Sequence, residues 1–90
     1  MESRVALIGV IVENPDSVEK LNGLLHQYAR YIIGRMGIPY PKKEISIISI
    51  TMDAPSDVIS SLSGKLGMLP GVNIKTIYSK AAGQTGEKEE

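Results

Sequence analysis

One candidate for anion chemistry is the pair Gly64 and Lys65, which lies in a serine-rich stretch of the chain. Phosphate-binding loops combine glycine and lysine in this way, because backbone amides and an ammonium group then face the phosphate. That motif also needs a glycine where Ile59 stands and a serine or threonine where Leu66 stands. A phosphate loop is therefore excluded. Gly64 and Lys65 remain candidates for ligand contact, although the favoured interpretation is a tolerated glycine on the outer side of a helix.

A second candidate is the acidic segment that follows the first apolar run, with Glu13, Asn14 and Asp16 around Pro15. Free amides at the start of a helix can receive a carboxylate or another anion. The same residues also suit ordinary helix capping, with Asn14 as the cap and Pro15 at the first helical position. Because Glu13 and Asp16 would repel an anion, capping is the favoured interpretation, and ligand binding by these three residues is the alternative.

Metal and covalent chemistry have few residues to draw on. The chain has no cysteine and one histidine, His26. Disulfides, thiolate zinc sites and thiol nucleophiles are therefore excluded, and a single imidazole makes a poor metal site. No set of acid and base residues converges in the pattern. We expect no catalytic residues, no metal and no cofactor, so the chain is predicted not to be an enzyme.

Length and charge restrict the class of protein further. Ninety residues allow one domain, and ten basic side chains balance ten acidic ones. A neutral domain has no net field to attract nucleic acid or anionic lipid. The apolar run near the N-terminus is too short to span a bilayer and lacks a signal-peptide cleavage pattern. We therefore expect a cytoplasmic protein with no membrane partner and no direct nucleic-acid partner.

The hydrophobic periodicity predicts a strand–helix–strand unit that occurs twice. The predicted elements are a strand over residues 5–12, a helix of about six turns over 18–36, a weak edge strand over 38–43, a strand over 44–52, a helix over 58–69 and a strand over 72–78. Beyond them, the chain has no large apolar side chain. The prediction is therefore one domain over residues 1–79 and a disordered tail over residues 80–90.

Two such units connected by right-handed crossovers give a ferredoxin-like β-α-β-β-α-β sandwich, an α+β fold whose two helices cover one face of a four-stranded antiparallel sheet. Its first and third strands are central, and here both are apolar on both faces. One face packs the helices and the other needs a cover, for which we predict another subunit. The residues predicted at subunit contacts are Leu7 and Ile11 on the first strand, with Leu24 and Tyr31 together on a flank of the first helix.

The helical pattern over residues 18–33, the isoleucine-rich third strand and above all the sequence of residues 62–72, LSGKLGMLPGV, resemble the iron-only hydrogenase system regulators. The resemblance extends from Arg4 to about Ser79. It implies a small bacterial protein of ACT-like fold, similar to the C-terminal domain of nickel-responsive regulators. In ACT-like domains the loop after the first strand often borders a small-ligand site between subunits, and here that loop contains Glu13, Asn14 and Asp16. The resemblance carries over no catalytic residues.

Other proteins of this fold match less well. The loop after the first strand is acidic, unlike the arginine-bearing loop of an acylphosphatase, and the central strands lack the stacking aromatics of an RNA-recognition motif. The sequence therefore predicts a non-catalytic regulatory, ligand-sensing or adaptor domain that acts as a homodimer or tetramer, with a possible small-molecule effector. The alternatives are a metal-responsive sensor or a DNA-associated transcriptional regulator, in which an oligomer gathers Arg30, Arg35, Lys42 and Lys43 into one basic surface.

Overall fold

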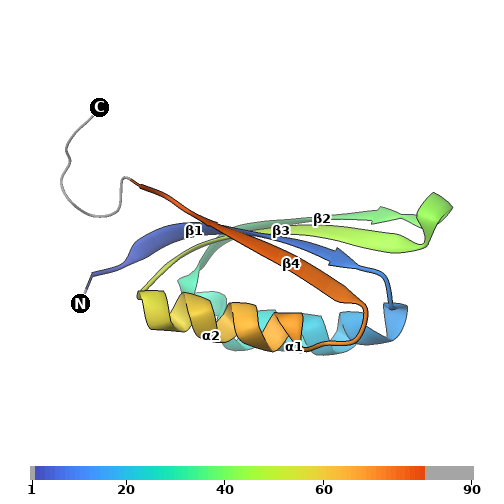
Figure 1. Ribbon diagram of the computed structural model, residues 1–90, viewed down its shortest axis with the longest axis horizontal. Helices are drawn as coiled ribbons and strands as arrows, with labels where there is room; N and C mark the ends of the chain where they lie inside the picture. Colours follow the sequence, from blue (N-terminus) through green and yellow to red (C-terminus); the bar gives the residue numbers. More distant parts are fainter. Residues whose placement is uncertain (1, 81–90) are drawn as a thin grey trace.

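The main elements follow one another along the chain in the order β1-α1-β2-β3-α2-β4, as the computed structural model in Figure 1 shows. The structure describes residues 2–80. The main elements are β1 (Arg4–Val12), α1 (Val18–Gln27), β2 (Ile32–Tyr40), β3 (Ile45–Ala54), α2 (Ser56–Gly67) and β4 (Val72–Tyr78). Three short 3-10 turns connect some of them, namely η1 (Pro15–Ser17), η2 (Ala29–Tyr31) and η3 (Pro41–Lys43).

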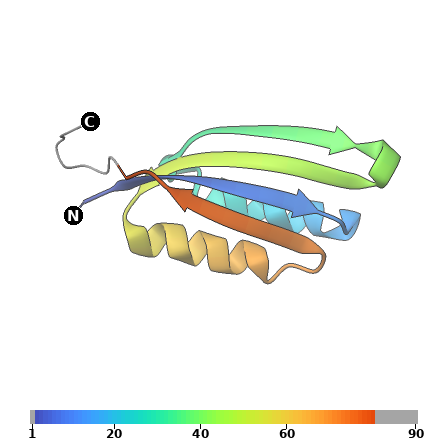
Figure 2. The same cartoon turned by 45° about the horizontal axis from the view of Figure 1, so that its top comes forward.

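The four strands form one antiparallel sheet in the order β2-β3-β1-β4. Figure 2 shows the strands in this order with both helices beneath them. The predicted ferredoxin-like sandwich is therefore confirmed, with β1 and β3 in the centre of the sheet. Proline cannot donate to a ladder, and Pro39 accordingly lies in the edge strand β2.

The first predicted helix was too long. The apolar residues Tyr28, Ile32 and Met36 recur every four residues, but α1 ends at Gln27 and a strand begins at Ile32. A step of four fits a helix face and also fits one face of a strand, so periodicity alone does not separate the two. The sheet decides, because Ile32 to Tyr40 pair with β3 as its edge strand and cannot be helical at the same time. Tyr31 consequently lies in η2 and not on the flank of a helix.

The predicted weak strand over residues 38–43 was correspondingly misplaced. β2 runs from Ile32 to Tyr40, and the prolyl-lysyl stretch that follows forms the turn η3. A bulge interrupts the pairing with β3 between Ile32 and Gly34. Because a bulge adds one residue to one strand, Ile32 faces the helices and Met36 faces the other side of the sheet.

The core lies between the sheet and the helices. Every second residue of β1, from Ala6 to Val12, is at most 2% exposed. These side chains meet buried side chains from α1, β3, α2 and β4, and β2 adds the half-buried Ile32. The largest fully buried side chains include Ile8, Leu21, Leu25, Ile50, Met52, Ile59, Leu62 and Leu66. A strand with period-two burial beneath two amphipathic helices is what the sequence pattern predicted.

The loop between β1 and α1 is fastened to the turn before β4. The buried Ser17 hydroxyl donates to the Pro70 carbonyl at 2.6 Å, and the Glu13 amide donates to the Gly71 carbonyl at 2.7 Å. Gly71 has a φ of 69°, and a Cβ at this position would lie 2.6 Å from the Cβ of Asn14. This crossing therefore requires glycine, both for its backbone conformation and for the close approach.

The two helices have 10 and 12 residues, which corresponds to roughly 15–18 Å of length. In the described part of the chain, neither helix is long and apolar enough to cross a membrane. Of the predicted tail, residues 80–90, only Lys80 lies within the described residues, so the predicted domain boundary stays a prediction.

Candidate functional site

The sheet face opposite the helices carries most of the exposed large hydrophobic side chains of residues 2–80. Eight of them lie on this face with exposed fractions between 36% and 64%, namely Val5, Leu7, Ile11, Met36, Ile38, Tyr40, Ile47 and Ile77. Every strand contributes at least one. We call this surface the free sheet face. A contiguous apolar surface of this kind is typical of an interaction site.

The ladder register arranges these side chains in rows across the strands. One row contains Ile38, Ile47 and Ile11, and another pairs Leu7 with Ile77. Between them runs a row whose central members are Ser49 and Gly9. A Cβ added to Gly9 would have only the Lys75 carbonyl oxygen near it, at 4.0 Å. The free sheet face therefore has two apolar rows and, between them, a row that is small only at its centre, with Met36 and Lys75 at its ends.

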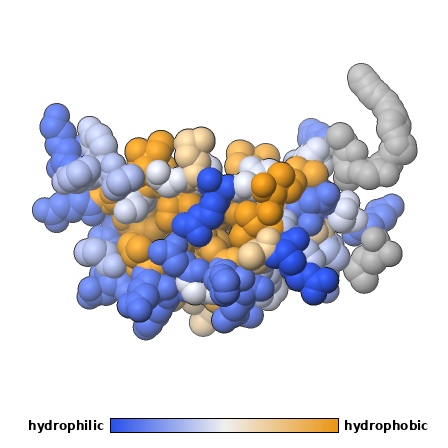
Figure 3. Space-filling view, turned by 180° about the vertical axis from the view of Figure 1, so that it is seen from behind, coloured by the Kyte–Doolittle hydropathy of each residue, from blue (hydrophilic) through white to orange (hydrophobic). Residues whose placement is uncertain are grey.

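Figure 3 views the molecule from the side of β2 and α1. Apolar surface follows the sheet in the upper half, whereas the helix below is covered by hydrophilic side chains. The edge strand contributes to this surface, since Met36 and Ile38 are 61% and 50% exposed. The apolar surface therefore extends as far as the edge strand of the sheet.

The structure separates the four residues predicted at subunit contacts. Leu7 and Ile11 lie on the free sheet face, at 43% and 41% exposure. Leu24 and Tyr31 lie on the other side of the sheet, half-buried against the core. The first pair is therefore available to a partner over the sheet, and the second pair contributes to the packing of the helical layer.

The candidate ligand residues of the loop after β1 have local partners. The Asn14 side-chain oxygen accepts from the Asp16 amide at 2.9 Å. The backbone of Glu13 bonds to Gly71, as described above. Asn14 thus caps the turn in the way the sequence favoured, and Pro15 occupies the first position of η1. Glu13 and Asp16 have exposed side chains.

The other two ligand candidates lie on α2, in a different neighbourhood. Gly64 is exposed, with open space where a side chain would stand. The Lys65 ammonium lies 5.3 Å from the centre of the Tyr28 ring, at the end of α1. The structure therefore brings Lys65 to Tyr28, and no contact joins it to Glu13, Asn14 or Asp16 within residues 2–80.

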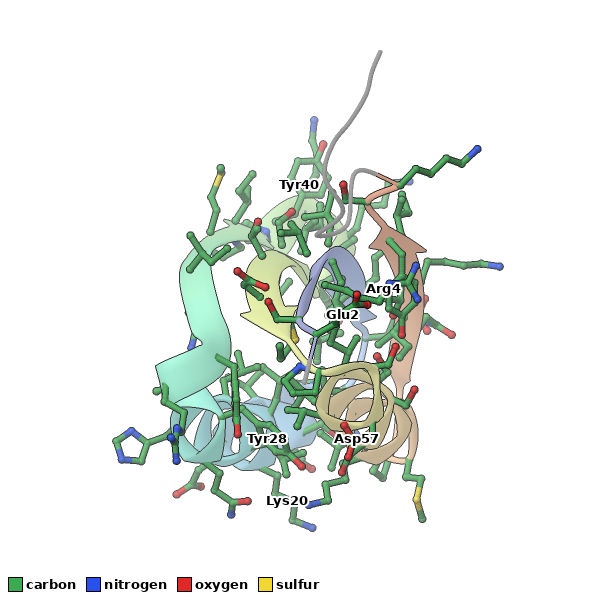
Figure 4. All side chains as sticks on the ribbon, turned by 90° about the vertical axis from the view of Figure 1, so that its left-hand side faces the viewer. Glu2, Arg4, Lys20, Tyr28, Tyr40 and Asp57 are labelled. Carbon is green, nitrogen blue, oxygen red and sulfur yellow. The ribbon has the colours of Figure 1, made fainter. Side chains whose placement is uncertain are left out.

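Tyr28, Ser61 and Lys65 form a polar cluster that the sequence did not predict. The Tyr28 hydroxyl is hydrogen-bonded to the Ser61 hydroxyl at 2.9 Å. Lys65, followed by Ser61, lowers the pKa of Tyr28 below its ordinary value of 10.0. Figure 4 shows Tyr28 where the two helices meet. The spacing of Ser61 and Lys65, one helical turn apart, was visible in the sequence, but their tyrosine partner comes from the packing of α1 against α2.

His26 has an exposed side chain on α1. Within residues 2–80, no three His, Asp or Glu side chains come close enough to hold a metal ion together. A metal site that includes His26 would need ligands from another subunit, and the metal-sensor alternative stays a prediction in that form.

The four basic residues of the DNA alternative do not form one patch in a single protomer. Arg30 lies in η2 before β2, whereas Lys42 and Lys43 lie in η3 after it. The nine residues of β2 separate these positions by roughly 30 Å. A common basic surface would have to be built by an oligomer, as the sequence also indicated.

Comparison with solved structures gives two informative matches. The protein TM1266 from Thermotoga maritima, described as uncharacterized, is 32% identical, with a TM-score of 0.85 over 88% of this chain and 100% of that chain. A formyltetrahydrofolate deformylase from Pseudomonas putida KT2440 matches with a TM-score of 0.59 at 9% identity, over 81% of this chain and 28% of that chain. The second match concerns the fold alone. None of the curated proteins matches.

A family model covers residues 4–76, which is nearly the whole folded part of the chain. The matched region includes the free sheet face except Ile77, both helices and the loop between β1 and α1. Together with the similarity to TM1266, this match establishes that the chain belongs to the TM1266-like family, whose description is "Iron-only hydrogenase system regulator, putative".

Proposed function

We propose that this protein is a non-catalytic regulatory module that acts as a homodimer, formed through the free sheet face. The observation that carries the proposal is the gathering of eight exposed large hydrophobic side chains on that face. Leaving so much apolar surface in water is unfavourable by about 25 cal/mol per Å². The family description, which names a regulator, supports the regulatory part.

The occupant that best suits the free sheet face is a second copy of the same chain. Two sheets pack face to face when the side chains of one settle between those of the other. Each copy has both protruding side chains and a space to receive them, because the apolar rows containing Ile11 and Leu7 lie on either side of the open space over Gly9. A two-fold axis through the centre of the face would bring apolar side chains of each copy onto the open space over Ser49 and Gly9 of its partner.

The size of the face also suits self-association. Four strands of seven to ten residues give a projected area on the order of 500 Å², before protruding side chains are counted. Specific interfaces bury roughly 800 Å² per partner. The protruding side chains add surface and bring the area of the face close to that size. The face carries few charges, with Lys75 and Asp53 near its borders.

The non-catalytic part of the proposal is supported by the chemistry available in residues 2–80. The one cluster with a shifted pKa, Tyr28 with Ser61 and Lys65, lies on the outer surface of the helices and not in a cavity. An exposed cluster cannot exclude water or hold a substrate in a fixed orientation, which efficient acid and base catalysis requires.

The experiment is to measure the mass of the protein in solution by light scattering or analytical ultracentrifugation, for the wild type and for Leu7→Glu. We expect a dimer for the wild type, and a dissociation constant at least about tenfold higher for the variant, because a carboxylate without a partner is costly to bury. Met68→Glu is the matched control, since Met68 is 84% exposed at the end of α2, away from the sheet. A wild type that stays at 9.7 kDa contradicts the proposal.

A second variant tests the packing of the two copies. Gly9→Leu adds a side chain to the centre of the free sheet face, where the protomer has room for it. The protomer should keep its fold, because a strand accepts leucine more readily than glycine. The dimer should weaken, since the added side chain occupies the space that the partner needs. An unchanged dissociation constant would move the interface away from this face.

A further inference from the structure

A second surface feature lies on the helix side of the β2 edge. A shallow open depression of about 290 Å³ is lined by Asn22, Leu25, His26, Ala29, Ile32 and Arg35. The last helical turns of α1 form one wall, and the first half of β2 forms the other. Figure 3 looks toward this side of the molecule. None of the residues singled out as ligand candidates from the sequence belongs to it.

The depression presents an oriented guanidinium group. Arg35 donates from Nη2 to the side-chain oxygen of Asn22 at 2.9 Å. A guanidinium has five N–H donors, so most of its donors stay available. Within residues 2–80 the structure gives Arg35 no carboxylate partner. His26, one helical turn after Asn22, brings an imidazole to the same wall.

The remaining lining is apolar. Ile32 is half-buried, Ala29 is exposed, and Leu25 lies beneath them in the core at 2% exposure. A site with an apolar floor and a few convergent polar groups fits a ligand that has both characters. The planar fork of an arginine matches a carboxylate in particular, because two parallel hydrogen bonds can form.

We propose that this depression binds a small carboxylate that carries a short apolar tail. The carboxylate pairs with Arg35 beside Asn22 and His26, and the tail lies on Ile32 and Ala29. The site is open and small, so an affinity of about 1 mM is the expected scale for a fragment-sized acid.

The site lies behind the strand that borders the proposed dimer interface. Arg35 faces the depression, and the next residue, Met36, faces the free sheet face. A ligand on one side of β2 and a second subunit on the other side therefore contact adjacent residues of one strand. Coupling between the ligand and the second subunit through β2 rests on the proposed dimer, whereas binding of the carboxylate itself does not.

The test is a titration of the ¹⁵N-labelled full chain with isovalerate, followed by backbone amide shifts. We expect saturable shifts centred on the lining residues, with a dissociation constant of about 1 mM. Isovaleramide, which has the same tail without the charge, should cause no saturable shifts. Absence of saturable shifts with isovalerate up to about 50 mM overturns the proposal, as do equal shifts from the amide.

Variants assign the binding to the depression. Arg35→Gln should raise the dissociation constant for isovalerate at least tenfold, because it removes the charge and the fork together. Lys42→Gln removes the same charge from η3 and should leave binding unchanged. Equal effects of the two variants would assign the binding to general charge and contradict the site. Leu7→Glu should bind isovalerate normally even if it is monomeric, so failure of the dimer and failure of the site are distinguishable.

Discussion

The two faces of the central strand β1 are both rich in apolar residues but have opposite surroundings. On the helix side, the alternate residues of β1 are Ala6, Ile8, Val10 and Val12, each at most 2% exposed. On the free sheet face, the intervening residues include Val5, Leu7 and Ile11, each about two-fifths exposed. Nothing in the hydrophobicity of β1 distinguishes the two sets. The difference arises because both crossover helices must lie on the same side of the sheet.

This comparison shows how one small sheet can bury the apolar side chains of one face and leave those of the other face exposed. The helix side buries its side chains within one chain, so its contribution to folding does not depend on protein concentration. No part of residues 2–80 covers the free sheet face, and in the proposed dimer its side chains are buried against another molecule. Its contribution should therefore grow with concentration, by mass action.

The largest expected effect comes from a matched pair of truncations on neighbouring residues of β1. Ile8→Ala should lower the free energy of unfolding by about 2–5 kcal/mol, because it opens a cavity in the core. Leu7→Ala should cost less than about 1 kcal/mol in dilute protein, where that side chain is already partly in water. Urea unfolding measures both values.

Repeating the two unfolding measurements at a higher protein concentration distinguishes the two faces. The cost of Leu7→Ala should increase when the unfolding is repeated at a higher concentration, while the cost of Ile8→Ala stays nearly constant. Equal costs for the two variants at both concentrations would abolish the distinction between the faces.

An intermediate effect is expected where the helical layer is fastened to the sheet. Gly71→Ala should lower stability by about 2 kcal/mol, because it combines a positive φ with a close approach to Asn14. Gly64→Ala is the matched control, since α2 has open space there and alanine favours a helix by about 1 kcal/mol. Thermal unfolding should separate them, with the first variant melting lower by roughly 8–16 °C and the second melting at or above the wild type. An unchanged melting temperature in Gly71→Ala would mean that the loop between β1 and α1 can move away from the turn before β4.

The smallest effect concerns the outer surface of the helical layer. Lys65 and Ser61 lower the pKa of Tyr28, so tyrosinate is favoured in the folded protein. The stabilisation is fully present above the unfolded pKa of about 10 and is lost as the pH falls through the lower folded value. Near neutral pH it should contribute nothing.

An ultraviolet titration of the four tyrosines measures this shift. One tyrosine of the wild type should ionise at lower pH than the others, and Lys65→Met should remove that early component. Lys75→Met, on the other side of the sheet, is the control. An unchanged titration in Lys65→Met would show that the lysine does not act on Tyr28.

The error in the first helix teaches where sequence patterns become ambiguous. After Gln27 the chain has no glycine or proline until Gly34, so no stop signal marks the end of the helix. The β-branched pair Ile32 and Ile33 favours a strand, but a four-residue apolar step pointed to a helix. Only the pairing of Ile32 to Tyr40 with β3 resolves the choice, and that pairing is a property of the whole sheet.

The candidate sites divide in the same way. Leu7 and Ile11 could be placed on a free sheet face from alternation and topology, because strand geometry is regular. The contacts of Lys65 with Tyr28 and of Arg35 with Asn22 could not be predicted, since each joins elements whose relative placement depends on packing. Leu24 and Tyr31 were predicted to share a flank of one helix. Because α1 ends at Gln27 and Tyr31 lies in η2, the two residues are not on one helix.

The sequence by itself determined the class of fold, the central position of β1 and β3 and the excess of apolar residues over what one core can bury. These properties depend on local periodicity, turn residues and composition, which each segment carries alone. Tertiary structure decided where α1 ends, which side chains meet between the helices, and that a guanidinium borders an apolar depression at the edge of β2. The physical reason is that these features depend on contacts between segments far apart in the chain, whose geometry is set only when all layers pack together.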